Sequence, residues 1–134
     1  GLNSLGKNRA WTCHPLEHVL SAYYDITHGV GLAILTPRWM KHVLNEQTVD
    51  VFARFALNVW SVDPQLDCWT AAQQGIEKLS EFFASMGLPM TLREVGIDES
   101  RLEEMAEKAA ETDFSRAFVP LTREDILQIY RACL

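Results

Sequence analysis

The sequence predicts an all-α fold, a helical bundle built as one domain over residues 1–134. Three observations point to this fold class. Apolar residues recur in steps of three and four along several segments, which is the period of one helix face. Residues typical of helix starts and ends stand at the borders of these segments. No segment alternates strictly between apolar and polar residues, as a strand with one buried face would. Short links between the helices favour an antiparallel bundle.

The longest predicted helix has an apolar face that runs from Trp69 to Met86. Asp63 and Pro64 are expected to supply its N-cap and its first helical residue. Gly87 should end it in a left-handed conformation, and Pro89 should prevent its continuation. The apolar face of this helix consists of Trp69, Ala72, Ile76, Leu79, Phe83 and Met86.

Three further segments have the same helical period. One lies between Thr48 and Trp60, and its apolar stripe consists of Phe52, Phe55, Ala56 and Val59. Ser100 with Glu103 forms a capping-box pattern ahead of a second apolar stripe. Thr122 with Asp125 forms another such pattern and opens the last predicted helix.

Composition and charge exclude several classes of partner. The formal net charge is −6 and no basic run occurs, which argues against a nucleic-acid-binding surface. The longest apolar stretch, Val30 to Leu35, is far too short for a membrane span. The segment from Gly1 to Lys7 lacks the pattern of a signal peptide. We therefore expect neither nucleic acid nor a membrane as a partner.

The cysteines indicate a reducing compartment. Cys13, Cys68 and Cys133 are odd in number and form no CxxC pair, which fits a cytoplasmic protein better than a disulfide framework. Cys13 stands beside a histidine, so a reactive or metal-ligating thiol is one interpretation. A small buried hydrophobic residue is the more common role.

Three of the four histidines form a cluster in the sequence. His14 and His18 are four residues apart, so they would lie one turn apart on one side of a helix, and His28 follows ten residues later. Imidazole is a common ligand for zinc, iron and similar ions. Such pairs also arise by packing alone, and the spacing leaves both interpretations open. Glu17 precedes the second histidine, so this is not the HExxH pattern of zinc proteases. His42 lies outside the cluster and is expected at the solvated surface.

The run around these histidines resembles a known family. Residues 14–40, HPLEHVLSAYYDITHGVGLAILTPRWM, are similar to the second signature region of the iron-containing (group III) alcohol dehydrogenases. The similarity is best to the branch often called butanol dehydrogenases. Residues 120–132, PLTREDILQIYRA, also resemble the closing helix of that family. The resemblance therefore spans almost the whole chain.

The resemblance implies a particular architecture. Members of the family, which share a dehydroquinate synthase-like fold, join an N-terminal NAD(P)-binding domain to a C-terminal helical domain that holds one divalent metal. This chain would be that helical, metal-binding domain, and no glycine-rich phosphate loop occurs among its residues. The N-terminal nucleotide-binding domain would be a missing partner. An aspartate and a first histidine of the ligand set would lie upstream of Gly1.

The resemblance also implies roles for the histidines. His14 and His28 match metal ligands, and the ion would be Fe2+ or Zn2+. His18 matches a position close to the substrate and the nicotinamide, where it would relay a proton, orient the substrate or support His14. No residue that binds NAD(P)H is identified.

The function implied for the full-length parent is an NAD(P)-dependent, metal-requiring alcohol dehydrogenase or aldehyde reductase that acts on a small alcohol or aldehyde. The isolated chain is expected to be inactive. A stand-alone helical binding module that kept the fold without catalysis is the alternative. We also expect His14 and His28 to face one open, rather apolar side. Either two copies pair through this side into a homo-oligomer, or the segment Gly1 to Ala10 lies across it.

Overall fold

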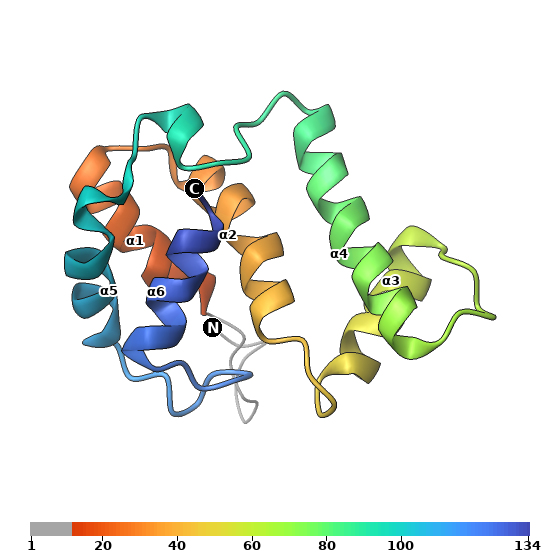
Figure 1. The fold of residues 1–134 in the computed structure, drawn as a ribbon. Coiled ribbons are helices and arrows are strands. Elements are labelled where there is room, and N and C mark those ends of the chain that lie inside the picture. The colour runs from red at the N-terminus through yellow and green to blue at the C-terminus, as the bar shows by residue number, and fades with distance from the viewer. Residues whose placement is uncertain (1–11) are drawn as a thin grey trace, which may run out of the picture.

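A computed structural model describes residues 12–134 and confirms the all-α fold for that part of the chain. It contains six α-helices, with short 3-10 helices at Arg93–Val95 and Glu99–Arg101 (Figure 1). The α-helices are α1 (Cys13–Tyr24), α2 (His28–His42), α3 (Val49–Trp60), α4 (Cys68–Ser85), α5 (Leu102–Ala110) and α6 (Arg123–Ala132). None of these helices is long and apolar enough to cross a membrane.

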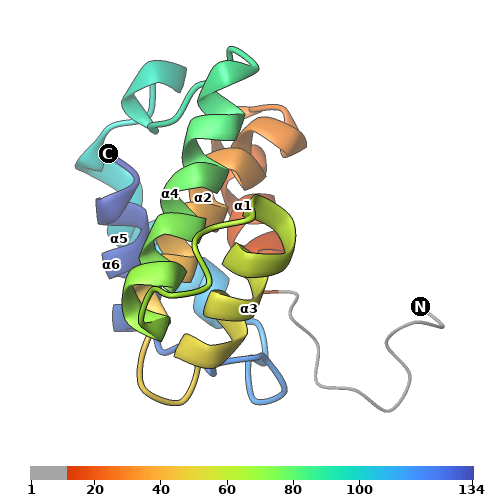
Figure 2. The same cartoon turned by 90° about the vertical axis from the view of Figure 1, so that its right-hand side faces the viewer.

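The helices form two groups that meet along α2. Helices α1, α5 and α6 pack on one side of α2, while α3 and α4 form a hairpin on its other side (Figures 1 and 2). The main core fills the first group and also includes residues of α3 and α4, and a smaller cluster lies between α3 and α4. Helix α2 therefore contacts both groups. Its first residue, His28, directly follows the turn that joins α1 to α2.

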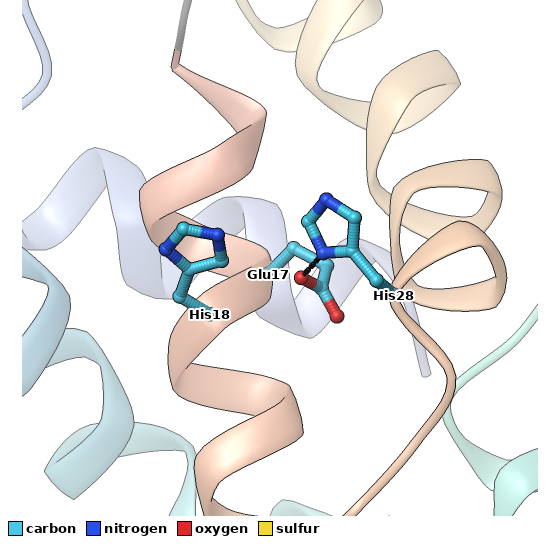
Figure 3. A group of neighbouring side chains, drawn as sticks. All are labelled: Glu17, His18 and His28. Atoms are coloured by element: carbon cyan, nitrogen blue, oxygen red, sulfur yellow. Dashed lines mark hydrogen bonds and ion pairs between the residues drawn. The ribbon is translucent and has the colours of Figure 1, made fainter.

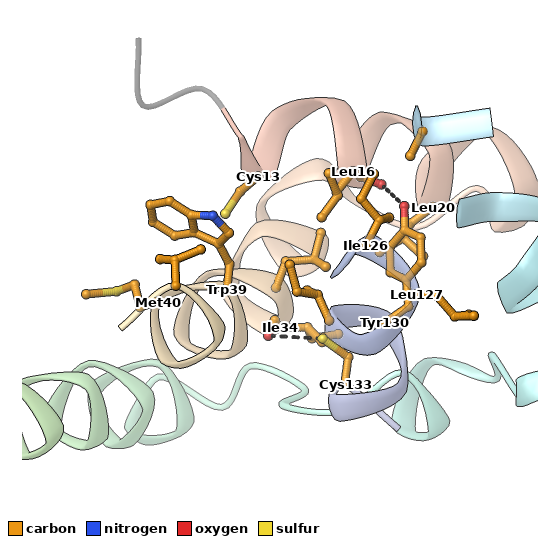
Figure 4. Close-up of a cluster of buried hydrophobic side chains, with 14 of the residues drawn as sticks. Cys13, Leu16, Leu20, Ile34, Trp39, Met40, Ile126, Leu127, Tyr130 and Cys133 are labelled. Atoms are coloured by element: carbon orange, nitrogen blue, oxygen red, sulfur yellow. Dashed lines mark hydrogen bonds between the residues drawn. The ribbon is translucent and has the colours of Figure 1, made fainter. Parts of the chain in front are cut away.

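Tyr130 on α6 is the largest fully buried side chain in the main core. Its hydroxyl group donates a hydrogen bond of 2.8 Å to the carbonyl oxygen of Leu16 on α1 (Figure 4). Burial raises the pKa of Tyr130 well above its ordinary value, so the phenol stays neutral and can keep donating. This hydrogen bond thus holds α6 against α1, the helix that carries His14 and His18.

Helices α3 and α4 approach closely where Gly75 faces Ala56. A Cβ atom added at Gly75 would lie 2.5 Å from the Cβ atom of Ala56 and 3.0 Å from its Cα atom. These separations are shorter than any van der Waals contact, and one of the atoms belongs to the backbone. The glycine is therefore what allows the two helices to pack at this distance.

Replacing Gly75 with alanine should lower the free energy of unfolding by about 1–2 kcal/mol, because the cost of overpacking exceeds the helix propensity that alanine adds. Urea unfolding of the chain would measure the change. Gln73→Ala, at an exposed position of the same helix, is the matched control and should be close to neutral. Adding Ala56→Gly to the Gly75→Ala variant should restore part of the loss. A Gly75→Ala variant as stable as the unsubstituted chain would contradict the close approach.

Two predicted capping patterns are confirmed. Thr122 and Asp125 form a complete capping box at the start of α6: each side chain accepts the other residue's backbone N–H. Gly87, directly after the C-cap of α4, has a φ of +75°, the left-handed conformation expected of it. Both patterns depend on residues within one turn of each other, so they rely little on distant contacts.

Two other predicted caps are wrong. The N-cap of α4 is Asp67, whose carboxylate accepts the backbone N–H groups of residues 69 and 70. Asp63 and Pro64 belong instead to a preceding turn, in which the Asp63 carboxylate accepts the N–H of Gln65 at 2.9 Å. Ser100 donates its hydroxyl to Asp98, which caps the 3-10 helix before α5. In both cases an aspartate better placed for the first turn competes successfully with the predicted residue.

Candidate metal centre

A tight turn between α1 and α2 creates the candidate site. Asp25 adopts a left-handed conformation with φ of +51°, and its N–H donates to the carbonyl of Ser21 at 2.9 Å, which ends α1. Thr27 is extended and serves as the N-cap of α2. The chain thereby reverses within three residues. His28, the first residue of α2, is turned back toward the histidines of α1.

The three predicted site histidines lie together. The ring centroids of His14 and His28 are 5.2 Å apart, those of His18 and His28 are 5.4 Å apart, and those of His14 and His18 are 6.3 Å apart. His14 is half-buried, whereas His18 and His28 are exposed. Converging imidazoles at an accessible surface suit a divalent transition metal, so the residues fit the ion that the sequence implied.

Glu17, which the sequence-based prediction did not include in the site, also belongs to this cluster. Glu17 is fully buried, and its carboxylate contacts Nδ1 of His28 (Figure 3). The carboxylate also accepts the hydroxyl hydrogen of Ser21. The sequence pattern gives Glu17 no role, because it does not stand where the glutamate of an HExxH motif does. The available signal was its place on the buried face of α1, formed by Cys13, Leu16 and Leu20, where a carboxylate needs partners.

Two different sets of ligands can be drawn from this cluster. The family resemblance implies His14 and His28. Proximity instead groups Glu17, His18 and His28, whose donor atoms lie within 4.8 Å of one another. The Glu17 side chain is 0% exposed while that of His28 is 46% exposed. The carboxylate thus lies behind the imidazole, on the protein side. We therefore favour the histidines as the groups that face an incoming ion.

Cys13 is a packed core residue. It is buried beside the indole of Trp39 (Figure 4), and burial raises the pKa of its thiol to about 12. A thiol in that state remains protonated at neutral pH and is a poor nucleophile. Of the two interpretations, the structure supports the small hydrophobic residue.

His42 lies far along α2 from the cluster. It is exposed, as predicted, and its Nε2 atom is 3.0 Å from a carboxylate oxygen of Asp125. It is thus a surface residue with an ionisable partner, separate from the candidate site.

The expected apolar surface around the histidines is not found. In the described part of the chain, the large apolar side chains that are exposed are Val51, Val59, Trp69, Phe82 and Met86. All of them belong to α3 and α4 or to the residue after α4. The prediction of an apolar site face was therefore wrong for the described residues, because nearby apolar residues such as Val19 and Val30 pack against the main core. Whether residues 1–10 cross this face, the other prediction, lies outside the described residues.

Comparison with known proteins shows the family of the chain. The sequence model described as Fe-containing alcohol dehydrogenase family, C-terminal, matches residues 2–134. NADH-dependent butanol dehydrogenase A of Clostridium acetobutylicum is 49% identical over 133 residues, which are 98% of this chain and 34% of that relative. Probable NADH-dependent butanol dehydrogenase 1 of Bacillus subtilis is 38% identical over all of this chain and 35% of its own length. The chain thus spans about a third of the length of these relatives.

Solved structures agree with this assignment. The crystal structure of NADH-dependent butanol dehydrogenase A from Thermotoga maritima superposes with a TM-score of 0.79 at 31% identity, over 92% of this chain and 33% of that one. The aldehyde reductase YqhD from E. coli superposes with a TM-score of 0.87 over the whole chain. Its identity is 24%, so it supports the fold alone.

Proposed function

This chain belongs to the Fe-containing alcohol dehydrogenase family, and from that membership we propose that it is the metal-holding domain of an NAD(P)-dependent enzyme. The enzyme would interconvert small alcohols and aldehydes. The relatives at 49% and 43% identity are both named butanol dehydrogenases, which favours a short primary alcohol as the substrate.

The observation that carries the proposal is the convergence of His14, His18 and His28 at one accessible surface. We assign His14 and His28 as ligands of a divalent metal, Fe2+ or Zn2+. A catalytic site of this kind uses three or more protein ligands and keeps one position open. The remaining ligands would then come from other residues of the longer protein. When bound, the metal supplies Lewis-acid polarisation of the alcohol or aldehyde oxygen.

His18 is the residue that we assign to catalysis. It is exposed and its ring centroid lies 5.4 Å from that of His28, so a substrate held beside the ligands would be within its reach. An imidazole can accept and return a proton near neutral pH, which is what alcohol oxidation and aldehyde reduction require in turn. Support of His14 by contact is the other role open to it.

The coenzyme would be NAD(P)H, bound by an N-terminal nucleotide-binding domain. The butanol-type relatives are named NADH-dependent, whereas YqhD, at 27% identity, is named NADPH-dependent. Hydride transfer needs a nicotinamide held against the substrate, and this is the contribution of the second domain.

We place the enzyme in the cytoplasm because Cys13, Cys68 and Cys133 are all free thiols.

Metal removal tests this proposal in the longer protein that carries the chain. We expect about one divalent ion per chain by elemental analysis, and butanol-dependent reduction of NAD+ that a chelator abolishes and added metal restores. Full activity in the metal-free protein would contradict the metal role. Tight metal binding without oxidation of any alcohol would favour the alternative, a helical binding module.

A further inference from the structure

The carboxylate of Glu17 is buried between α1 and α2 with two donors directed at it. The hydroxyl of Ser21 approaches one oxygen, and Nδ1 of His28 approaches the other. The same hydroxyl lies 2.9 Å from the carbonyl oxygen of Ile26, in the turn that leads to His28. A carboxylate without solvent is costly unless its oxygens are satisfied. Here both oxygens are engaged, and both contacts lead to the start of α2.

A glycine provides the room for this carboxylate. A Cβ atom added at Gly31 would lie 2.6 Å from Cγ of Glu17 and 2.8 Å from its Oε1 atom. Any other residue at position 31 would push the carboxylate out of its place. Gly29, on the same first turn of α2, has nothing within 4 Å of such an atom. The space that a side chain would need at position 31 is therefore filled by Glu17, whereas the same space at position 29 is empty.

The contact also determines which nitrogen of His28 is available. Figure 3 shows Nδ1 facing the Glu17 carboxylate and the other ring nitrogen facing away from it. Where the Glu17 carboxylate accepts this contact, the hydrogen is carried by Nδ1. The neutral imidazole then has its free lone pair on Nε2, which is the atom a metal would bind.

We propose that Glu17 is a positioning residue that holds His28 in the Nδ1–H tautomer and presents Nε2 outward as the ligand atom. The metal part of this inference rests on the function proposed above, but the tautomer does not. A carboxylate that accepts the second N–H of a ligating imidazole fixes the orientation of the ring and makes it a stronger donor. Ser21 and Gly31 support this arrangement, the first through a hydrogen bond and the second through the space it leaves.

The tautomer can be read directly in the metal-free chain. Long-range 1H–15N correlation spectra distinguish the two neutral forms of each histidine, and a His28→Ala spectrum identifies the signals of His28. In a buffer alkaline enough to keep imidazoles neutral, we expect the Nδ1–H form for the unsubstituted chain. Glu17→Ala should give the mixture seen for a free imidazole. Glu17→Gln, which keeps an acceptor oxygen, should retain the Nδ1–H form.

Two glycine variants extend the same measurement without removing the carboxylate. Gly31→Ala should release His28 toward the free mixture, because the displaced Glu17 no longer meets Nδ1. Gly29→Ala, the matched control, should keep the unsubstituted spectrum. An Nε2–H tautomer in the unsubstituted chain would overturn the proposal, and so would an unchanged spectrum in both Glu17→Ala and Gly31→Ala. If Glu17→Ala does not fold, Gly31→Ala alone decides.

Metal affinity separates this inference from the proposed function. In the longer protein, competition between Co2+ and a chelator should show Glu17→Ala weakening Co2+ binding about 10- to 100-fold, the range for groups that support a ligand. Glu17→Gln should weaken it less, and the visible spectrum of bound Co2+ should change in Glu17→Ala. If the unsubstituted protein binds no Co2+, the metal proposal fails while the tautomer result still stands. Unchanged affinity in Glu17→Ala, with Co2+ bound, would overturn the positioning role.

Discussion

Replacing His28 or His14 with alanine should remove most of the metal from the longer protein that carries this chain, and nearly all of its turnover. The rings of the two residues lie 5.2 Å apart and come from different helices. Loss of either one leaves too few protein ligands to retain the ion. We expect turnover to fall by more than about 100-fold, beyond the loss seen when only a supporting partner is removed.

Elemental analysis and steady-state kinetics on the same preparations would measure both effects. His42→Ala is the matched control, because it removes an imidazole from α2 at an exposed position paired with Asp125, away from the site. It should keep both metal and turnover. If His14→Ala or His28→Ala retained a full equivalent of metal, the assignment of that residue as a ligand would be wrong.

His18→Ala should behave differently from the other two variants. We expect it to keep most of the metal and to lose turnover by about 10²- to 10⁴-fold, the range for removal of a group that transfers a proton. The comparison of the three variants therefore separates a ligand from a catalytic residue. Equal loss of metal in all three would show that His18 is itself a ligand.

Local patterns in the sequence were sufficient for part of the fold. The Thr122–Asp125 box and the left-handed Gly87 each involve residues within one turn, so the structure repeats what the pattern predicts. The start of α4 could not be chosen this way. Asp63 and Asp67 are both good N-cap residues, and Pro64 favours the first. The Asp63 carboxylate instead accepts a hydrogen bond within the turn that precedes the helix.

Part of the candidate site was likewise predictable from the sequence, and part was not. The spacing of His14, His18 and His28 is visible in the sequence, and the structure brings them together. The part played by Glu17 depends on how α1 and α2 pack, and on the space that Gly31 leaves at their contact. A sequence gives no direct record of which glycine faces which side chain. A charged residue on the apolar face of α1 was the one clue available.

The chain of 134 residues should show no alcohol-dependent reduction of NAD+ or NADP+ by itself, even with Zn2+ or Fe2+ supplied. Relatives named as dehydrogenases are about three times as long as the part this chain matches, and its sequence contains no glycine-rich phosphate loop. Hydride transfer requires a bound nicotinamide, and the imidazoles of His14 and His28 are fewer ligands than such a metal site needs.

Absorbance at the nicotinamide band, followed with butanol and each metal in turn, would test this expectation. The longer protein in the same assay is the positive control, and circular dichroism should show that the chain is helical, so that inactivity is not caused by misfolding. We expect no activity at all, because under the proposed function the nicotinamide site and the remaining metal ligands lie outside this chain. Metal-dependent reduction of the coenzyme above the blank would mean that these residues hold both coenzyme and substrate. The division of labour between two domains would then be wrong.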